Sequence, residues 1–232
     1  MEPAENEKLE SANAQDAQPD AKPEQDAVPE QEQEQEQSGE GKEGSFAADL
    51  MDLLESVFVS VFVVMLIFTF LVCTADVDGD SMKPTLEDGD RLLVSRIDRS
   101  YETGDVLILD AKKAYIFNDE MQVTEQEGLG KRIVKRLIAQ GGQEVDIHFD
   151  EGVVYVDGQP LDEPYVSSLT NYSTGSFQFP ITVPEGYIFV LGDNRYISKD
   201  SRSDEIGFVP VNQIVGKVFL RLSPLSSFGK VG

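Results

Sequence analysis

The chain has 232 residues, of which 43 are acidic and 19 are basic, giving a formal net charge of −24. Its only cysteine is Cys73 and its only histidine is His148, which excludes an internal disulfide, a thiolate metal cluster and a multi-histidine zinc site. A charge this negative repels phosphate backbones, and the sequence contains no evident basic patch, so we expect no nucleic-acid partner. No pattern indicates a cofactor or a metal.

The N-terminal part of the chain is strongly acidic. Residues 1–44 contain 14 acidic and 3 basic residues, almost no apolar side chains, and the run QEQEQEQ at 31–37. Such a segment cannot bury enough surface to offset the entropy lost on ordering. We therefore expect a disordered acidic tail, which is either a solvated leader or an interaction arm.

Residues 56–75, SVFVSVFVVMLIFTFLVCTA, form a stretch of 20 residues without a charge. At a rise of about 1.5 Å per residue, a helix of this length spans the roughly 30 Å hydrocarbon core of a bilayer. Apolar residues occupy every face, whereas a core helix in a small protein would show a polar face. The stretch also begins too late for a conventional cleavable signal peptide. It predicts one transmembrane helix, preceded by a juxtamembrane segment at 45–55.

Residues 76–232 are predicted to form short strands. The runs rich in β-branched residues and bounded by Gly, Asp or Pro lie at 91–97, 105–109, 132–138, 144–149, 153–156, 186–191 and 214–220. With no long amphipathic helix between them, they predict an all-β barrel or folded sheet. Two hairpin-like excursions, at 111–130 and 157–184, are predicted insertions, and a turn at 156–159 (VDGQ) supports the second.

A catalytic base other than histidine is required if the chain is an enzyme. His148 lies in a strand-like context with no serine motif nearby, which disfavours a Ser-His-Asp triad. A lysine can act as the base when an apolar, dehydrated setting lowers its pKa from about 10.4 towards neutrality. Lys135, in the strand-like run IVKRLI, meets that requirement. Most strand lysines extend to water, however, so its position alone does not establish a catalytic role.

The candidate nucleophile lies in the segment 77–86, VDGDSMKPTL, which directly follows the predicted span. Ser81 is at its centre. Gly79 gives the flexibility that lets main-chain N–H groups approach a reacting carbonyl, as an oxyanion hole needs, and Pro84 makes the exit rigid. The alternative is a plain turn between the anchor and the first strand, which would contain the same residue types.

A third segment, GDNRYISKDSR at 192–202, is dense in side chains that can bond to each other. Two aspartates and two arginines can form charge-assisted pairs that hold a loop in one shape. The hydroxyls of Ser198 and Ser201 can orient an amine. The alternative is a solvated loop of mixed charge.

Taken together, these segments resemble bacterial type I signal peptidases over residues 65–218. Four segments match in the family's order: a nucleophile box at 79–86, a structural-strand box at 89–106, a base box at 135–136 and a last box at 192–202. The resemblance implies the folded β-sheet barrel that signal peptidases share with self-cleaving Ser-Lys repressors. The single span and short second insertion are more similar to the Gram-positive type.

The resemblance implies a membrane-bound serine endopeptidase with a Ser-Lys dyad. Ser81 would attack the scissile carbonyl, and neutral Lys135 would take its proton and pass it to the leaving amine. The Ser81 main-chain N–H would hold the oxyanion. Gly79 stands where some members have a serine, which leaves the second donor open, a main-chain N–H being one candidate. Met82 would line the primary pocket, consistent with small side chains such as Ala in an Ala-x-Ala site.

The resemblance also implies supporting roles around the dyad. Ser198 would fix the lysine amine. Asp193 with Arg136, and Asp200 with Arg202, would brace the last box. No metal and no cofactor are implied.

The implied partners are the lipid bilayer and preprotein signal peptides emerging from the secretion translocon. The family topology is single-pass type II in the cell membrane, with the N-terminus in the cytoplasm and the catalytic domain outside. The positive-inside count slightly favours the opposite orientation, because Lys42 precedes the span while Lys83 and Arg91 follow it. Large domains translocate largely regardless of charge, so we expect the orientation that the resemblance implies.

Three alternatives stay open beside this interpretation. A catalytically inactive, membrane-tethered β-domain adaptor would have no need for an intact Ser81 and Lys135. A self-cleaving repressor would need a DNA-binding helical module, which the acidic tail cannot supply. A peptidase dedicated to a few surface or pilin proteins has the same sequence features. A slow self-cleavage after Ala75, giving a new start at Asp76, is a further hypothesis, since small residues end the predicted span.

Overall fold

The structure is a computed structural model that describes residues 43–231. The predicted acidic tail therefore lies outside the described residues, except for its last two positions. The first element is helix α1 (Glu43–Phe70). Its segment Phe46–Phe70 is long and apolar enough to cross a membrane.

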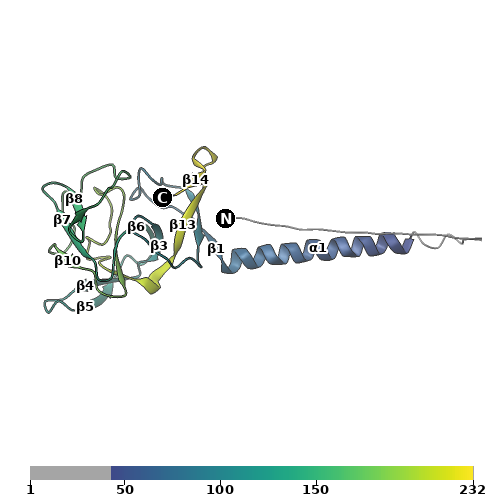
Figure 1. The fold of residues 1–232 in the computed structure, drawn as a ribbon, viewed down its shortest axis with the longest axis horizontal. Helices are drawn as coiled ribbons and strands as arrows, with labels where there is room; N and C mark the ends of the chain where they lie inside the picture. The colour runs from purple at the N-terminus through teal and green to yellow at the C-terminus, as the bar shows by residue number, and fades with distance from the viewer. Residues whose placement is uncertain (1–42, 232) are drawn as a thin grey trace, which may run out of the picture. The chain divides into compact units, whose positions relative to one another are not determined.

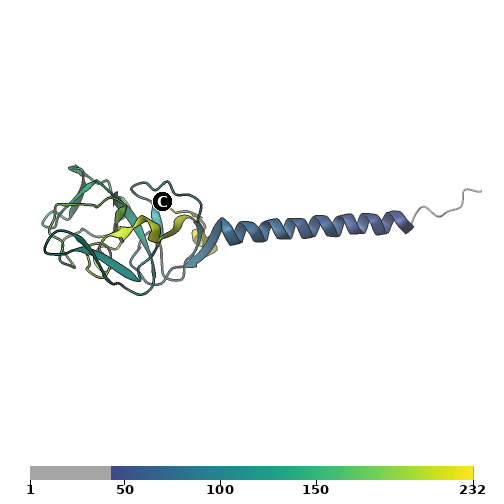
Figure 2. The same ribbon diagram turned by 90° about the horizontal axis from the view of Figure 1, so that it is seen from below.

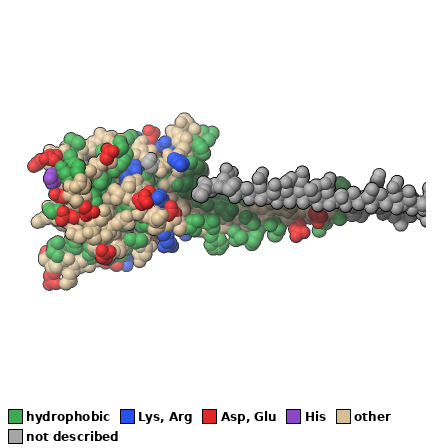
Figure 3. Space-filling view, viewed as in Figure 1, with side chains coloured by type: hydrophobic (Ala, Val, Ile, Leu, Met, Phe, Trp, Pro, Cys, Tyr) green, Lys and Arg blue, Asp and Glu red, His purple; other side chains and the backbone are tan. Residues whose placement is uncertain are grey.

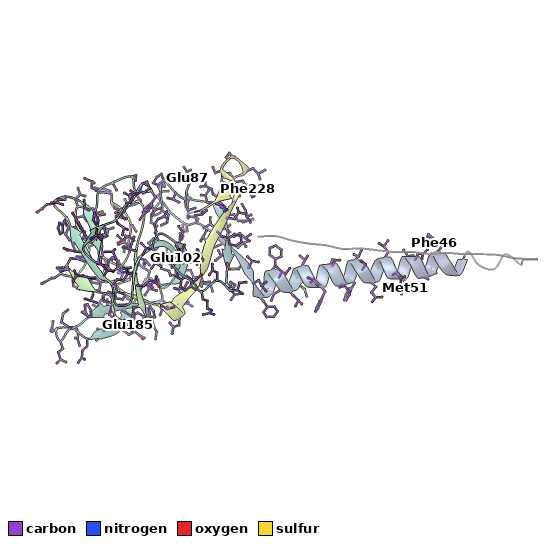
Figure 4. All side chains as sticks on the ribbon, viewed as in Figure 1. Phe46, Met51, Glu87, Glu102, Glu185 and Phe228 are labelled. Atoms are coloured by element: carbon purple, nitrogen blue, oxygen red, sulfur yellow. The ribbon has the colours of Figure 1, made fainter. Side chains whose placement is uncertain are left out.

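The side chains of α1 are exposed along its length. Phe46 and Met51, which are 72% and 66% exposed, project from different sides of the helix (Figure 4). Apolar side chains also make up most of the helix surface that is visible in Figure 3, with a few acidic side chains among them. A helix that is apolar all round and buries none of that surface in protein is suited to a lipid environment. The helix is consistent with a membrane anchor.

The boundaries of the helix differ from those predicted. The helix begins at Glu43, so it includes the predicted juxtamembrane segment, and it ends at Phe70 rather than residue 75. Residues Val72–Asp76 instead form strand β1. The prediction was wrong here because hydropathy does not separate an apolar helix from an apolar strand that follows it. The β-branched residues of β1 favour an extended chain, and the edge of strand β2 provides its hydrogen-bonding partner.

The main sheet has eight strands in the order β1-β2-β13-β3-β6-β11-β12, with β14 paired to β13. Its remaining strands are β2 (Arg91–Ser95), β3 (Val106–Asp110), β6 (Arg132–Gln140), β11 (Tyr187–Leu191), β12 (Val209–Pro210), β13 (Ile214–Ser223) and β14 (Gly229–Lys230). Neighbouring strands are antiparallel. The sheet curls, as Figures 1 and 2 show from two directions. Register shifts along β13, against both β2 and β3, increase the local bend of that strand.

Two smaller sheets complete the β domain. One has the strand order β10-β7-β8-β9, formed by β10 (Ile181–Thr182), β7 (Glu144–His148), β8 (Val153–Val156) and β9 (Gln159–Pro160). The other is the hairpin of β4 (Lys113–Phe117) and β5 (Val123–Glu127), at the lower left in Figure 1. Beyond α1, the described helices are the short 3-10 turns Val211–Gln213 and Leu225–Ser227. The predicted all-β class is confirmed.

All seven predicted strands are present, with boundaries that differ by a few residues. The excursion at 111–130 contains the β4–β5 hairpin, and the excursion at 157–184 contains β9, a long loop and β10. Asp157 and Gly158 both have positive φ angles, 52° and 73°, which is the pattern of a type I′ hairpin turn. The turn predicted from VDGQ is therefore confirmed.

One of three buried apolar clusters supports the segment that follows β1. It includes Val77, Met82 and Leu86 of that segment together with Leu92 and Val94 of β2. Met82 and Leu86 are fully buried. Burying each such side chain stabilises the fold by about 1.5–3 kcal/mol relative to exposing it. This packing fixes the segment carrying Ser81 against the sheet.

Candidate active site

The structure brings Ser81 and Lys135 into direct contact, although 54 residues separate them in the chain. Lys135 Nζ lies 2.7 Å from Ser81 Oγ and also donates a hydrogen bond to the Val134 carbonyl at 2.8 Å. Ser81 lies in the loop after β1, and Lys135 lies near the middle of β6. The contact has the distance expected of a nucleophile and its base.

The lysine amine is kept away from water. Lys135 is 3% exposed, and this burial lowers its pKa to about 8. The negative charges of Asp200 and Asp193 oppose the shift, whereas the positive charge of Lys131 adds to it. Because desolvation disfavours the charged form, a substantial fraction of the amine is neutral near physiological pH. A neutral amine can accept a proton from a hydroxyl.

Strand β6 explains why a lysine can be buried here. The strand pairs with β3, where Leu107 lies opposite Lys135, and with β11 on its other side. Ile133 and Leu137, which share a face with Lys135 as the alternation predicts, are buried too. The amine therefore lies in an apolar section of a central strand and cannot extend to solvent.

The loop at 192–202 holds the nucleophile segment from the other side. The main-chain N–H of Asn194 donates to the Ser81 carbonyl at 3.0 Å, and the Asn194 side chain donates to the Asp80 carbonyl at 3.2 Å. A Cβ on Gly192 would lie 2.5 Å from the Ser81 carbonyl oxygen, so only glycine fits there. Sequence reasoning placed Asn194 in the last box but assigned it no role.

Gly79 was expected to support the oxyanion site, with the second donor left open, and its own main-chain N–H does not supply that donor. Its main-chain N–H donates to Asp88 Oδ1 at 2.8 Å, so it is not available as an oxyanion donor in this structure. Its φ angle of 91° is one that glycine adopts freely, which indicates a conformational role in the turn. Within residues 43–231, the main-chain N–H of Ser81 donates no hydrogen bond to protein. That N–H is free to bind an oxyanion.

Ser198 is buried beside the dyad, but its expected hydrogen bond to Lys135 is absent. Its Oγ makes no hydrogen bond to the lysine amine, although it lies close enough to the Asp200 carboxylate to help lower the pKa of that group. The lysine amine bonds to Ser81 and the Val134 carbonyl instead. A Cβ on Gly192 would lie only 2.1 Å from Ser198 Oγ, so the hydroxyl packs tightly against that glycine.

Arg136 and Asp193 form the ion pair that the resemblance implies. Both side chains are buried, and two hydrogen bonds of 2.8 and 2.6 Å join the guanidinium to the carboxylate. Arg136 also donates to the Gly104 carbonyl at 2.6 Å, and Thr85 donates its hydroxyl to Asp193. The guanidinium carbon of Arg136 lies over the ring of Tyr165, 3.8 Å from the centre of that ring. The pair therefore connects β6, the last box and the nucleophile segment.

Asp200 and Arg202 form the second implied pair. Both are completely buried and share two hydrogen bonds of 2.9 Å. Burial raises the pKa of Asp200, but the opposing charge and hydrogen bonds of Arg202 outweigh it and hold that pKa below its usual value. The main-chain N–H of Gly192 donates to the same carboxylate at 3.0 Å. This pair fixes the shape of the last box.

A third buried ion pair was missed by sequence reasoning. Arg195, which is 1% exposed, pairs with Glu163 and donates to Thr170 Oγ1 at 2.6 Å. It also donates to the Gly192 carbonyl at 3.0 Å. Glu163 and Thr170 come from the second excursion, about 30 residues earlier in the chain. The sequence contains no periodic signal that relates these positions.

A cleft of about 590 Å³ contains the dyad. One wall is formed by residues 73–81, and the other by residues 129–135. Met82 was expected to line the pocket, but its side chain is fully buried in the core and is not among the lining residues. The exposed ring of His148 lies on β7, next to Asp146, and takes no part in the cleft. Within the described part of the chain, no group of three or more His, Cys, Asp or Glu side chains could hold a metal.

The hypothesis of self-cleavage after Ala75 is disfavoured by this arrangement. Ala75 lies within β1 and is paired with Leu92 of β2. The bond from Ala75 to Asp76 is therefore part of a sheet, and this strand would have to leave the sheet before its own cleft could bind it.

Comparisons with known proteins show the family of the chain. Residues 50–223 match the family described as "Signal peptidase, peptidase S26". The chain is 36% identical over 159 residues to "Probable signal peptidase I-1" of Synechocystis sp., covering 67% of this chain and 74% of the relative. It is 34% identical over 197 residues to "Signal peptidase IB" of Staphylococcus aureus, covering 78% and 93%.

A crystal structure of a signal peptidase I from Enterococcus faecalis is also similar, with 30% sequence identity and a TM-score of 0.37. The match covers 51% of this chain and 96% of that one. Given the family match over most of its length and its similarity to these curated relatives, the chain belongs to the signal peptidase family of serine peptidases.

Proposed function

We propose that the chain removes signal peptides from preproteins as a membrane-bound serine endopeptidase in which Ser81 is the nucleophile and Lys135 is the general base. Membership of this family supports the removal of signal peptides. The observation that carries the proposal is the 2.7 Å contact between Ser81 Oγ and a buried lysine amine whose pKa is lowered to about 8.

The reaction follows from these two groups. Neutral Lys135 takes the hydroxyl proton as Ser81 Oγ attacks the scissile carbonyl, and the main-chain N–H of Ser81 binds the oxyanion. The lysine then gives the proton to the departing amine, which leaves an ester on Ser81. A water molecule, deprotonated by the same lysine, attacks the ester and releases the signal peptide. The final proton transfer restores Ser81 and neutral Lys135.

The cleft suits an extended substrate. Its walls include the two segments that carry the dyad, at 73–81 and 129–135. An extended peptide between such walls gains affinity from main-chain hydrogen bonds and specificity from the space left for alternate side chains. The residues that line the cleft include Ala75 of β1 and Val77, which directly follows that strand. We propose that the substrate has small residues at the cleavage site, as in Ala-x-Ala.

The proposed location is the cell membrane, with the N-terminus in the cytoplasm and the β domain outside. Only Leu71 separates α1 from β1, and β1 contributes to the wall of the cleft. An active site so close to the end of a membrane-spanning helix would meet signal peptides as they emerge from the translocon. An inactive adaptor is disfavoured, because such a protein gains nothing from a buried lysine in contact with a serine.

Cleavage of a defined precursor tests the function. The full chain in detergent is incubated with a preprotein that carries an Ala-x-Ala site, and the N-terminus of the product is sequenced. We expect one product that begins directly after the second Ala, and greatly reduced cleavage when that Ala is replaced by Phe. Ser81→Ala enzyme serves as the control for contaminating peptidases. A product with another start, or equal cleavage by the control, would overturn the proposal.

A further inference from the structure

A second cavity lies next to the end of α1. It has a volume of about 480 Å³ and shares with the substrate cleft only two lining residues, Arg132 and Val215. Its lining includes the last two residues of α1, Thr69 and Phe70. It also includes three arginines, Arg96, Arg99 and Arg132, and we call it the arginine pocket. No part of the proposed reaction uses it.

The arginines of this pocket are not neutralised by the protein. Within the part of the chain that the structure describes, Arg99 and Arg132 make no ion pair or hydrogen bond through their side chains. Arg96 donates one long hydrogen bond, 3.4 Å, to the Thr69 carbonyl. Beyond residue 55 the chain contains 26 acidic and 16 basic side chains, so acidic residues are in excess. Three guanidinium groups beside one cavity therefore form a local cluster of positive charge in an acidic domain.

The nearby carboxylates have partners of their own. Asp110 lines the pocket, but its side chain pairs with the Lys112 amine at 3.2 Å and accepts the Lys112 main-chain N–H at 3.2 Å. Asp98 accepts the main-chain N–H and hydroxyl of Ser100, at 3.1 and 2.8 Å, and lies 4.0 Å from the Lys217 amine. The pocket therefore has an excess of positive charge.

Apolar side chains flank the arginines. Ile97, between Arg96 and Arg99, is 64% exposed, and Phe70 at the end of α1 is also 64% exposed. Exposed apolar groups next to arginines are typical of segments that lie at a membrane surface, with the apolar groups in the acyl region and the guanidinium groups among the headgroups. The end of a membrane-spanning helix is where that boundary lies.

We propose that the arginine pocket binds the phosphate of an anionic phospholipid in the leaflet where α1 ends. The proposal rests on the proposed function only in placing α1 across the membrane. Guanidinium groups bind phosphate oxygens through paired hydrogen bonds, and anionic lipids attract basic clusters near the surface. Because Arg132 lines both cavities, the bound lipid lies beside the substrate cleft and keeps that cleft at the membrane surface.

Lipid selectivity of the full chain tests this inference. The protein is reconstituted in phosphatidylcholine bilayers with a trace of spin-labelled phosphatidylglycerol or phosphatidylcholine, and the motionally restricted fraction of each is measured by electron paramagnetic resonance. We expect phosphatidylglycerol to be preferred by about threefold or more, given the attraction of several basic side chains. The Arg99→Gln/Arg132→Gln variant should bring the ratio close to one.

The matched control is Lys113→Gln/Lys230→Gln, which removes two exposed charges elsewhere and should keep the preference. Circular dichroism checks that each variant is folded. Arg99→Gln alone, on an exposed loop, should lose part of the preference for phosphatidylglycerol. Inorganic phosphate at constant ionic strength distinguishes the ligand source: if wild type shows no lipid preference while millimolar phosphate raises its melting temperature and not that of the arginine variant, the site takes free phosphate and the lipid assignment is wrong. An equal preference in wild type and the arginine variant would also overturn it. Because no precursor is present, these outcomes are independent of the peptidase assay.

Discussion

At the scale of single residues, the site depends on burying a lysine that water would otherwise protonate. The amine has one hydroxyl and one carbonyl as hydrogen-bond partners and no directly bonded carboxylate among the described residues. Asp193 and Asp200 act on it only through their charge, because each is bonded to an arginine. The arginines thus allow carboxylates near the dyad without a salt bridge that would keep the lysine charged.

The pH dependence of cleavage follows from the lysine. Since the neutral amine is the proposed base and burial lowers its pKa to about 8, kcat/KM should rise with pH through about 8 and then level off. Steady-state cleavage of a peptide substrate between pH 6 and 10 measures this profile. A rate that falls as pH rises through this range would exclude a lysine base.

The same burial should cost stability. Between pH 8 and 10.5 an unfolded lysine binds a proton that the folded one has lost, so the free energy of unfolding rises with pH across this window. Below pH 8, the burial of Lys135 lowers the free energy of unfolding by its full amount, up to about 3 kcal/mol. We therefore expect Lys135→Met to be inactive but more stable than wild type at pH 7, by thermal unfolding in detergent. Lower stability at pH 7, or a difference that grows between pH 8 and 10.5, would contradict this.

The two residues of the proposed dyad, and the contact that the structure shows between them, could be predicted from sequence, but their surroundings only in part. The motifs around Ser81 and Lys135 indicated both residues, and the pairing of Asp193 with Arg136 followed from the family resemblance. The position of Met82 was not predictable, because the segment's fold decides whether its side chain faces the core or the cleft. The use of the Gly79 N–H by Asp88 depends on a turn that the sequence pattern does not specify.

At the scale of elements, one strand and two loops meet at the proposed dyad. They are strand β6, the loop after β1 and the last box at 192–202. Their contacts are mostly buried and polar, and Gly192 lies where the last box contacts the Ser81 segment. Such a network is rigid only while each group has its partner, because an unpaired buried charge is costly.

Gly192→Ala tests the close contact of these segments. The new Cβ would lie 2.1 Å from Ser198 Oγ and 2.5 Å from the Ser81 carbonyl oxygen, so the nucleophile segment must move. We expect kcat to fall by about a hundredfold, since a displacement of about 1 Å can have that effect. Gly229→Ala is the matched control, because nothing lies within 4 Å of its Cβ position. Equal activity of the two variants would refute the argument.

The second excursion should be part of the catalytic framework. Glu163 is the partner of the buried Arg195, whose guanidinium also donates to the Gly192 carbonyl. Removing one member of a buried pair costs about 3–5 kcal/mol. We expect Glu163→Gln to lower the melting temperature and to increase proteolysis within 157–184. Glu185→Gln, on an exposed turn, is the comparison (Figure 4). An unchanged melting temperature would show that the pair contributes little.

Secondary structure was predictable where residue type and period agreed. The seven predicted strands have clear β-branched runs, and the VDGQ turn has the residues that positive φ angles require. Strand β1 was missed because its apolar residues continue the hydropathy of the helix. The pairing of Glu163 with Arg195 was missed because ion pairs between distant loops leave no periodic pattern.

At the scale of the whole molecule, the anchor and the active site are nearly continuous. The helix ends at Phe70, β1 begins at Val72, and β1 forms both the edge of the main sheet and part of the cleft wall. The arginine pocket is lined by the end of the same helix. The chain therefore places the proposed active site and the proposed lipid contact close to the same end of α1.

Two truncations separate the anchor from the site. A protein that starts at Val72 keeps β1 and should cleave a short soluble peptide at close to the full-length rate, but should cleave membrane-embedded precursors more slowly. A protein that starts at Val77 loses β1, exposing the edge of β2 and removing one wall of the cleft. It should be inactive and prone to aggregation. Full activity of the shorter protein on the peptide would contradict the role given to β1.

The most direct test of the account is the rate of precursor cleavage by Ser81→Ala and Lys135→Ala enzyme, compared with wild type and with Lys113→Ala as a matched surface control. We expect both dyad variants, folded by circular dichroism, to lose at least about a thousandfold in kcat, since the two residues are proposed to act as one unit. We also expect the double variant to be no slower than either single one, while the control keeps its rate. Wild-type rates for either dyad variant would contradict the assignment of Ser81 and Lys135.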